Sequence, residues 1–163
     1  VRLEFWPSIY LGAPIDAYHM AAGTKFLVSA VARVFEYPCK ADHVLILEGE
    51  QGAGKSTILE ILGGEWYSDT HFMLGEKDGY QQICGVWICE LGELDSFNKA
   101  DTTRAKGFFS SISDRYRPPY GKRPDDFARQ CVFAGSTNQD AYLKDPTGNR
   151  RYWPIQCKKI PPS

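Results

Sequence analysis

The sequence has no apolar run long enough to cross a membrane. A spanning helix needs about 20 apolar residues, whereas the best candidate, residues 26–35, is interrupted by Ser29 and Arg33. The first residue is Val1, and no basic and apolar leader of the kind that directs secretion follows it. We therefore expect a soluble, cytoplasmic protein without a membrane partner, and one cut from a longer polypeptide.

Histidine is scarce, and the cysteines form no recognisable metal or disulfide pattern. The chain has three histidines, far apart in sequence, and five cysteines without a C-x-x-C pair. The cysteines are odd in number, scattered and mostly embedded in apolar stretches, which is typical of buried, reduced thiols. This pattern argues against a zinc site.

The chain also has little net charge, but its charges are unevenly distributed. The formal net charge is −1, yet residues 1–100 carry seven Lys and Arg against 14 Asp and Glu, whereas residues 101–163 carry 12 against six. A basic C-terminal part suits contact with a polyanion, and it equally suits two halves that neutralise each other. With 163 residues, 43% of them hydrophobic, we expect one domain with a substantial core.

The most specific feature that is present is a complete phosphate-binding loop motif. Residues 49–56 read Gly-Glu-Gln-Gly-Ala-Gly-Lys-Ser and follow an apolar run at 43–48. In this motif the glycines let backbone N–H groups turn toward phosphate, Lys55 reaches the β- and γ-oxygens, and the Ser56 hydroxyl ligates Mg²⁺. A helix expected over 55–62 would direct its positive end at the anion. The motif predicts a nucleoside triphosphate with Mg²⁺ as ligands, with nucleotide contacts from Gly49, Glu50, Gln51, Gly52, Ala53, Gly54, Lys55, Ser56 and Thr57.

A second apolar run, residues 85–90, ends in an acid. Glu90 stands where a P-loop protein places the acid that holds the water shell of its metal, and Glu93 and Asp95 follow. Two assignments stay open: Glu90 orients Mg²⁺ while Glu93 activates water, or Glu90 does both. Asp95 is better interpreted as the N-cap of a helix over residues 98–110.

Further polar residues flank the later strands. The run 131–134 leads to Asn138, whose amide would position the attacking water, because the carboxyl ends of parallel strands face the ligand. Arg150 and Arg151 lie between a turn and an apolar strand, which suggests an arginine finger that acts on a neighbouring subunit's nucleotide. Since neighbours in a strand point to opposite faces, only one of the two would be the finger.

Basic and aromatic residues interleave between residues 113 and 129. Two prolines followed by Tyr-Gly-Lys-Arg at 120–123 predict a projecting turn or hairpin. Its basic residues would contact phosphates, while Tyr116 or Tyr120 packs on a sugar or base. The alternative is a solvated loop in which Asp114, Asp125 and Asp126 pair with the arginines. The candidate nucleic-acid contacts are Arg115, Arg117, Tyr120, Lys122 and Arg123.

Apolar segments alternate with helical patterns along the chain. Helical spacing over 14–36 is broken at Gly23 and ended by Pro38, a short helix is expected at 76–83, and strands are expected at 44–47, 66–67, 71–73, 85–90, 131–134 and 152–155. This order predicts an α/β fold, a three-layer sandwich with a mostly parallel central sheet. The expected plan is a helical segment (1–40) packed on a core (41–159), with a tail at 160–163.

Together these residues closely resemble the virulence-associated protein E family over nearly the whole chain. The resemblance rests on the loop run 47–57, on Trp-Ile-Cys-Glu-Leu-Gly-Glu-Leu at 87–94, on Asp-Arg-Tyr-Arg-Pro-Pro-Tyr-Gly at 114–121, and on Ser-Thr-Asn at 136–138 with Thr-Gly-Asn-Arg-Arg-Tyr-Trp-Pro at 147–154. The P-loop domain of that family is similar to superfamily 3 helicases of phages and mobile elements.

The resemblance implies a P-loop ATPase core of the AAA+ kind, assembled as a ring that is often hexameric. It also implies ATP bound between subunits and a hairpin that tracks single-stranded DNA. One departure is that the acidic strand of the superfamily usually ends in two adjacent acids, whereas Glu90 and Glu93 are separated here.

The sequence therefore favours the ATP-hydrolysing motor domain of a DNA helicase or primase-helicase. Two other functions remain open at this stage. One is a P-loop kinase of a small substrate, and the other is a nucleotide-gated DNA-binding or interaction module without helicase activity.

Overall fold

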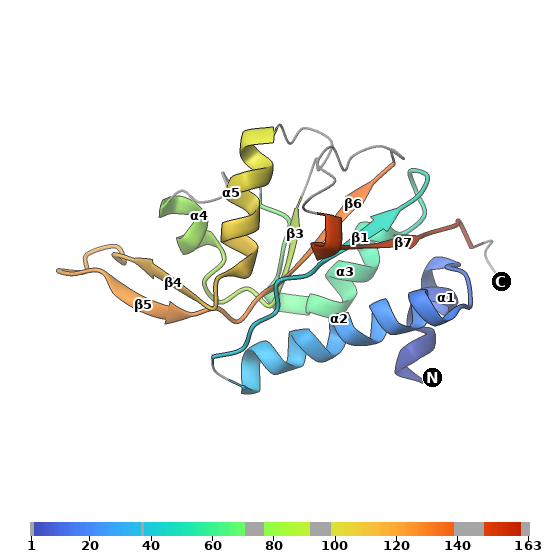
Figure 1. Cartoon of the computed structure of the whole chain (residues 1–163), viewed down its shortest axis with the longest axis horizontal. Coiled ribbons are helices and arrows are strands. Elements are labelled where there is room, and N and C mark those ends of the chain that lie inside the picture. The colour runs from blue at the N-terminus through green and yellow to red at the C-terminus, as the bar shows by residue number, and fades with distance from the viewer. Residues whose placement is uncertain (1, 37, 71–76, 92–98, 139–148, 161–163) are drawn as a thin grey trace.

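The protein has an α/β fold built on a parallel sheet (Figure 1). The computed structural model describes residues 2–36, 38–70, 77–91, 99–138 and 149–160. Within them, five strands form one sheet in the order β2-β3-β6-β1-β7, and every neighbouring pair is parallel. The strands are β1 (Val44–Glu48), β2 (Tyr67–Ser68), β3 (Ile88–Leu91), β6 (Val132–Thr137) and β7 (Tyr152–Gln156).

Helices cover both faces of this sheet and make it the middle of three layers. One face carries α1 (Trp6–Leu11), α2 (Ala17–Phe35) and α3 (Lys55–Gly63), while α4 (Lys77–Gln82) and α5 (Lys99–Ser110) lie on the other. Leu45 and Leu47 point into the first layer, whereas Val44 and Ile46 point into the second. Because both faces are covered, the first four residues of β1 are all apolar and buried, with no polar alternate position, and the polar Glu48 comes only at the end. The predicted α/β sandwich with a mostly parallel sheet is confirmed.

The helix α2 runs without interruption through Gly23, where the sequence indicated a break. The Asp16 side chain caps its first turn by accepting a 2.9 Å hydrogen bond from the backbone N–H of His19. A Cβ on Gly23 would lie 2.5 Å from Cγ of Pro7, so the glycine gives α1 room to pack closely against α2. The helix α1, which lies within the expected helical segment 1–40 but ahead of the helical spacing at 14–36, occupies that space.

Several predicted strand bounds shift by a few residues. The expected strands 66–67 and 85–90 correspond to β2 and to the shorter β3, and the run 131–134 extends to Thr137 in β6. The expected strand at 71–73 lies outside the described residues. Short 3₁₀ turns occupy Leu3–Phe5, Gly64–Trp66 and Asn149–Arg151. None of the described helices is long and apolar enough to span a bilayer.

The basic and aromatic segment forms an antiparallel hairpin that stands apart from the main sheet (Figure 1). Its strands are β4 (Ser113–Tyr116) and β5 (Asp125–Ala128). At its foot the buried guanidinium of Arg129 pairs with the Asp114 carboxylate and donates to the carbonyl of Phe108. The same guanidinium lies 4.4 Å from the centre of the Phe108 ring. The hairpin is thus fixed to α5 and to the sheet.

Candidate functional site

The glycine-rich loop begins directly after β1, at the carboxyl edge of the sheet. Gly49 has φ +151° and Gly54 has φ +77°, conformations that favour glycine. A Cβ on Gly49 would lie 2.3 Å from the carbonyl oxygen of Cys157, so this glycine also permits close contact with the chain after β7. Gly54 is the N-cap of α3, and backbone N–H groups at the start of this helix therefore face the loop.

The ammonium group of Lys55 is held by the loop itself. It donates hydrogen bonds to the carbonyl oxygens of Gly49, at 2.6 Å, and of Glu50, at 2.8 Å. The loop thus surrounds the ammonium group of Lys55. Other oxygen acceptors, such as those of an anion, can replace the two carbonyl oxygens as its hydrogen-bond partners. A lysine in this position provides positive charge at the mouth of an anion site.

Glu90 lies across from Ser56 and is the centre of a network of hydroxyl groups. The carboxylate is 4% exposed. Its Oε1 accepts hydrogen bonds from Ser56 and Ser136, each at 2.7 Å, and its Oε2 accepts one from Tyr67 at 2.6 Å. These donors come from α3, β6 and β2, so three elements fix a single carboxylate. Burial, together with the bond to Glu90, raises the pKa of the Tyr67 hydroxyl, which keeps it a donor.

Tyr67 and Ser136 were not among the predicted site residues. Ser136 follows an apolar run whose end, by the parallel-strand argument applied to Asn138, faces the same edge. Tyr67 carried no comparable signal, because its role depends on the pairing of β2 with β3, in which Tyr67 lies opposite Ile88. The pairing of distant strands brings the hydroxyl to Glu90.

The hydrogen-bond partners of Glu90 indicate that the site suits a cation. Within the described part of the chain they are all hydroxyl groups, so no protein cation neutralises the buried carboxylate. A buried carboxylate without a counter-charge is unfavourable. The Ser56 hydroxyl and the Glu90 carboxylate are oxygen ligands of the kind that Mg²⁺ prefers. The described residues contain no cluster of three His, Cys, Asp or Glu that could hold a metal by themselves.

A groove of about 660 Å³ opens over the loop. It is lined by residues of the loop, of α3 and of the end of β6: Gln51, Gly52, Gly54, Lys55, Ser56, Thr57, Ser136, Thr137 and Asn138. The backbone N–H of Gly49 donates to the carbonyl of Thr137 at 3.1 Å, which ties the loop to β6. Asn138 is exposed at this rim, so its amide is available to a ligand in the groove.

The two predicted arginines lie at the opposite edge of the sheet. Arg150 and Arg151 belong to the 3₁₀ turn before β7 and not to a strand, so the prediction that they point to opposite faces of a strand is wrong. The residue after them, Tyr152, pairs with Val44 at the start of β1, whereas the loop leaves the end of β1. About 15 Å of strand therefore separates the arginines from the loop of their own chain.

The exposure and the neighbours of the two arginines are consistent with a position near the start of β1, away from the loop. Arg150 is exposed, whereas Arg151 is half-buried and its Nε makes no hydrogen bond within the described part of the chain. Burial lowers the pKa of His43, the residue before β1, and the charge of Arg151 contributes to the same effect. Two other predicted residues, Glu93 and Asp95, lie outside the described residues.

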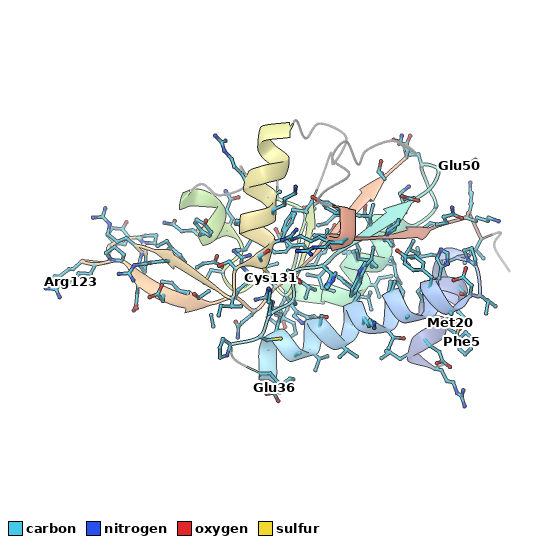
Figure 2. The ribbon with its side chains drawn as sticks, viewed as in Figure 1. Phe5, Met20, Glu36, Glu50, Arg123 and Cys131 are labelled. Atoms are coloured by element: carbon cyan, nitrogen blue, oxygen red, sulfur yellow. The ribbon has the colours of Figure 1, made fainter. Side chains whose placement is uncertain are left out.

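The hairpin distinguishes its two candidate tyrosines. Tyr116 is buried and stacks on Phe127 with ring centres 4.4 Å apart, and burial raises its pKa to about 12. Tyr120 is fully exposed in the turn. Arg115 pairs with Asp126 at 3.3 Å and Arg129 pairs with Asp114, so two of the arginine–aspartate pairs that the solvated-loop alternative predicted are present, although the segment is a hairpin. The side chains of Arg117, Lys122 and Arg123 are exposed, and Arg123 lies at the far end of the hairpin (Figure 2).

Comparisons with known proteins extend these observations. The sequence profile of the virulence-associated protein E-like domain matches residues 1–162. The apo structure of the NrS-1 C-terminal region (305–718) is similar in fold, with a TM-score of 0.61 and 19% identity over 86% of this chain and 35% of that chain. An A-form apo structure of that region gives a TM-score of 0.58 at 19% identity, over 89% of this chain and 35% of that one. This chain thus spans about a third of the solved chains that it matches. No curated protein sequence matches it.

Proposed function

This chain belongs to the family of virulence-associated protein E-like domains, and we propose that it is a P-loop ATPase of the AAA+ and superfamily 3 helicase kind. Its role would be the motor domain of a phage or mobile-element DNA helicase or primase-helicase. The motor would translocate on single-stranded DNA as a ring.

The observation that carries this proposal is the 2.7 Å hydrogen bond from Ser56 to Glu90. It joins the last residue of the phosphate-loop motif, which follows β1, to an acid 34 residues later in β3, two strands away in the same sheet. A motif match by chance gives no reason for this contact. A nucleotide site needs it, because the metal that accompanies the phosphates requires a hydroxyl and an acid side by side.

The loop supplies the binding chemistry in this proposal. Lys55 would exchange the carbonyls of Gly49 and Glu50 for β- and γ-phosphate oxygens, and the N–H groups at the start of α3 would donate to the same anion. Ser56 and Glu90 would hold Mg²⁺, which when bound neutralises charge on the phosphates.

Hydrolysis also needs a positioned water and a base. Asn138, exposed at the rim of the groove, would orient the water. Glu90 or Glu93 would accept its proton. Glu90 has the advantage of a fixed orientation, because three hydroxyl groups hold its two oxygens.

The remaining charge would come from another subunit. Arg150 and Arg151 lie at the edge of the sheet that is remote from their own loop, so an arginine finger drawn from this pair would serve the loop of a neighbour. A closed ring of copies, expected to be a hexamer, gives each loop such a neighbour. The exposed basic residues of the hairpin, Arg115, Arg117, Lys122 and Arg123, would contact single-stranded DNA together with Tyr120.

ATP hydrolysis measured against protein concentration, with and without single-stranded DNA, tests the proposal. We expect specific activity to fall on dilution, because the site is shared, and to rise with DNA. Lys55→Ala should abolish hydrolysis, whereas Lys122→Ala with Arg123→Ala should abolish only the stimulation by DNA.

Other outcomes would contradict parts of the proposal. Specific activity that is constant on dilution would favour a kinase with a self-contained site. Slow turnover without strand separation would favour a nucleotide-gated binding module. A ring-forming protein whose rate ignores single-stranded DNA would not be a motor.

A further inference from the structure

The turn of the β4–β5 hairpin holds a tyrosine in a conformation that disfavours it. The backbone N–H of Gly121 donates to the carbonyl of Pro118 at 2.9 Å, which closes a four-residue β-turn. Tyr120 occupies the third position with φ +64° and is, within the described residues, the one non-glycine residue with positive φ. Glycine or asparagine is the usual choice at such a position, because a side chain crowds the backbone there.

No packing of the Tyr120 ring against the protein offsets this backbone strain. The residue is 106% exposed, so the ring packs against no other part of the chain. The next most exposed large hydrophobic residue in the described part of the chain is Phe35, at 79%. A strained and fully exposed aromatic residue is better explained by what it binds than by what it stabilises.

The structure around the turn is rigid. Pro118 and Pro119 restrict the backbone before Tyr120, and a Cβ on Gly121 would lie 3.0 Å from the carbonyl oxygen of Pro118. Further down, Tyr116 and Phe127 stack across the two strands. The ring of Tyr120 is therefore presented at the end of a stiff arm, so little flexibility is lost when it binds.

The charge near the ring identifies the kind of partner. Arg117, Lys122 and Arg123 are exposed in the same turn region. Arg115 is engaged with Asp126 lower in the hairpin, whereas Arg117, Lys122 and Arg123 form no ion pair with any described residue, so the positive charge available to a partner is concentrated near the tip. An exposed aromatic ring among cations suits a flexible polyanion that offers flat π faces, which is single-stranded nucleic acid. In a duplex the bases are stacked on each other and do not offer those faces.

We propose that Tyr120 stacks on an unpaired nucleobase, so that the hairpin binds the bases of single-stranded nucleic acid as well as its phosphates. This inference rests on the proposed function in one respect, the choice of single-stranded DNA as the partner. It adds the chemical means by which the hairpin selects unpaired strands.

An abasic oligonucleotide separates the two kinds of contact, because it keeps the phosphates and lacks the bases. Binding of labelled oligo-dT and of an abasic strand of equal length is measured by fluorescence anisotropy at one salt concentration. We expect the wild-type chain to bind oligo-dT about tenfold more tightly, which is the effect of one stacked base. Tyr120→Leu should reduce this preference to near unity, and Tyr120→Trp should retain it.

Three further variants complete the experiment. Lys122→Ala with Arg123→Ala should weaken binding of both oligonucleotides by the same factor and flatten the salt dependence. Tyr10→Leu, which replaces a half-exposed tyrosine of α1, should change neither. Tyr120→Gly should lose the preference for bases while the melting temperature stays equal or rises, because it relieves the positive φ.

Each result decides the proposal. Equal binding of the two oligonucleotides by the wild type, or a preference that survives in Tyr120→Leu, overturns the stacking role while leaving phosphate binding intact. Failure to bind either strand overturns both this inference and DNA as the load of the motor. Base-dependent binding by a chain that does not hydrolyse ATP supports the stacking role and contradicts the proposed ATPase.

Discussion

The Tyr67 hydroxyl donates a 2.6 Å hydrogen bond to Glu90 Oε2, while Ser56 and Ser136 share Oε1. This approach depends on Gly63, the last residue of α3, because a Cβ there would lie 2.7 Å from the Cβ of Tyr67. Tyr67 thus determines how the carboxylate is oriented without lining the groove.

Tyr67→Phe removes one donor and keeps the ring. We expect the free energy of unfolding to fall by about 1–3 kcal/mol, since a buried carboxylate oxygen loses its partner. The Mg²⁺ concentration that half-saturates nucleotide binding should rise about tenfold, as for other residues that orient a metal ligand. A fluorescent ATP analogue titrated with and without Mg²⁺ measures this. Binding without Mg²⁺ should not change, and Tyr10→Phe should alter neither quantity.

Glu90→Gln and Glu93→Gln distinguish the two acids. If Glu90 both orients the metal and activates water, its amide variant should slow hydrolysis about 100-fold or more, whereas Glu93→Gln should have a small effect. Initial rates at saturating ATP and Mg²⁺ are the measurement. A loss confined to Glu93→Gln would assign water activation to Glu93.

Gly49→Ala and Gly52→Ala test the packing of the loop. Both glycines have positive φ, but a Cβ on Gly49 would meet the Cys157 carbonyl at 2.3 Å, whereas one on Gly52 meets nothing within 4 Å. We expect Gly49→Ala to be the more destabilising by about 1–3 kcal/mol. Urea unfolding of the two variants gives the difference, and equal midpoints would contradict the close contact.

Mixed subunits test whether the arginine pair acts between copies. Lys55→Ala and the double variant Arg150→Ala, Arg151→Ala should each be nearly inactive alone. A mixture should recover activity, because some sites then pair an intact loop with an intact arginine. Assays of the mixture against the separate variants show this at once. Activity that does not recover would indicate that the arginines serve their own chain.

Two ion pairs of the hairpin should differ sharply in stability. Arg129→Met leaves the Asp114 carboxylate buried without its partner, and we expect a loss of about 3–5 kcal/mol. Arg115→Met breaks an exposed pair with Asp126 and should change stability by less than about 1 kcal/mol. Chemical denaturation measures both. Comparable losses would mean that the foot of the hairpin is not the anchor.

The sequence predicted well wherever a local pattern determines the structure. Apolar runs predict β1 and β6 because the part of a strand that is covered on both faces is apolar, and polar residues come only at the carboxyl end. The loop motif and the apolar run that ends in Glu90 led us to expect Ser56 and Glu90 at one edge of the sheet, since parallel strands bring their carboxyl ends together, and the two side chains are hydrogen-bonded there. The layered α/β fold follows from the same patterns.

What the sequence did not predict depends on register and close packing. Nothing local indicates that Tyr67 faces Glu90, because this requires β2 to pair with β3 at Ile88. Gly23 read as a helix break because glycine has a low helix propensity, and only its contact with Pro7 explains its presence in α2. The separation of the arginines from the loop likewise follows from the pairing of Tyr152 with Val44.

The strand β6 connects the hairpin to the groove. Only residues 129–131 separate the end of β5 from its start, and its last residue, Thr137, lines the groove beside the loop. The strand itself is six residues and about 20 Å long, so the foot of the hairpin and the groove lie near its two ends. Pairing with β1 and β3 on either side stiffens this strand, and we expect a load on the hairpin to be transmitted to the groove along it.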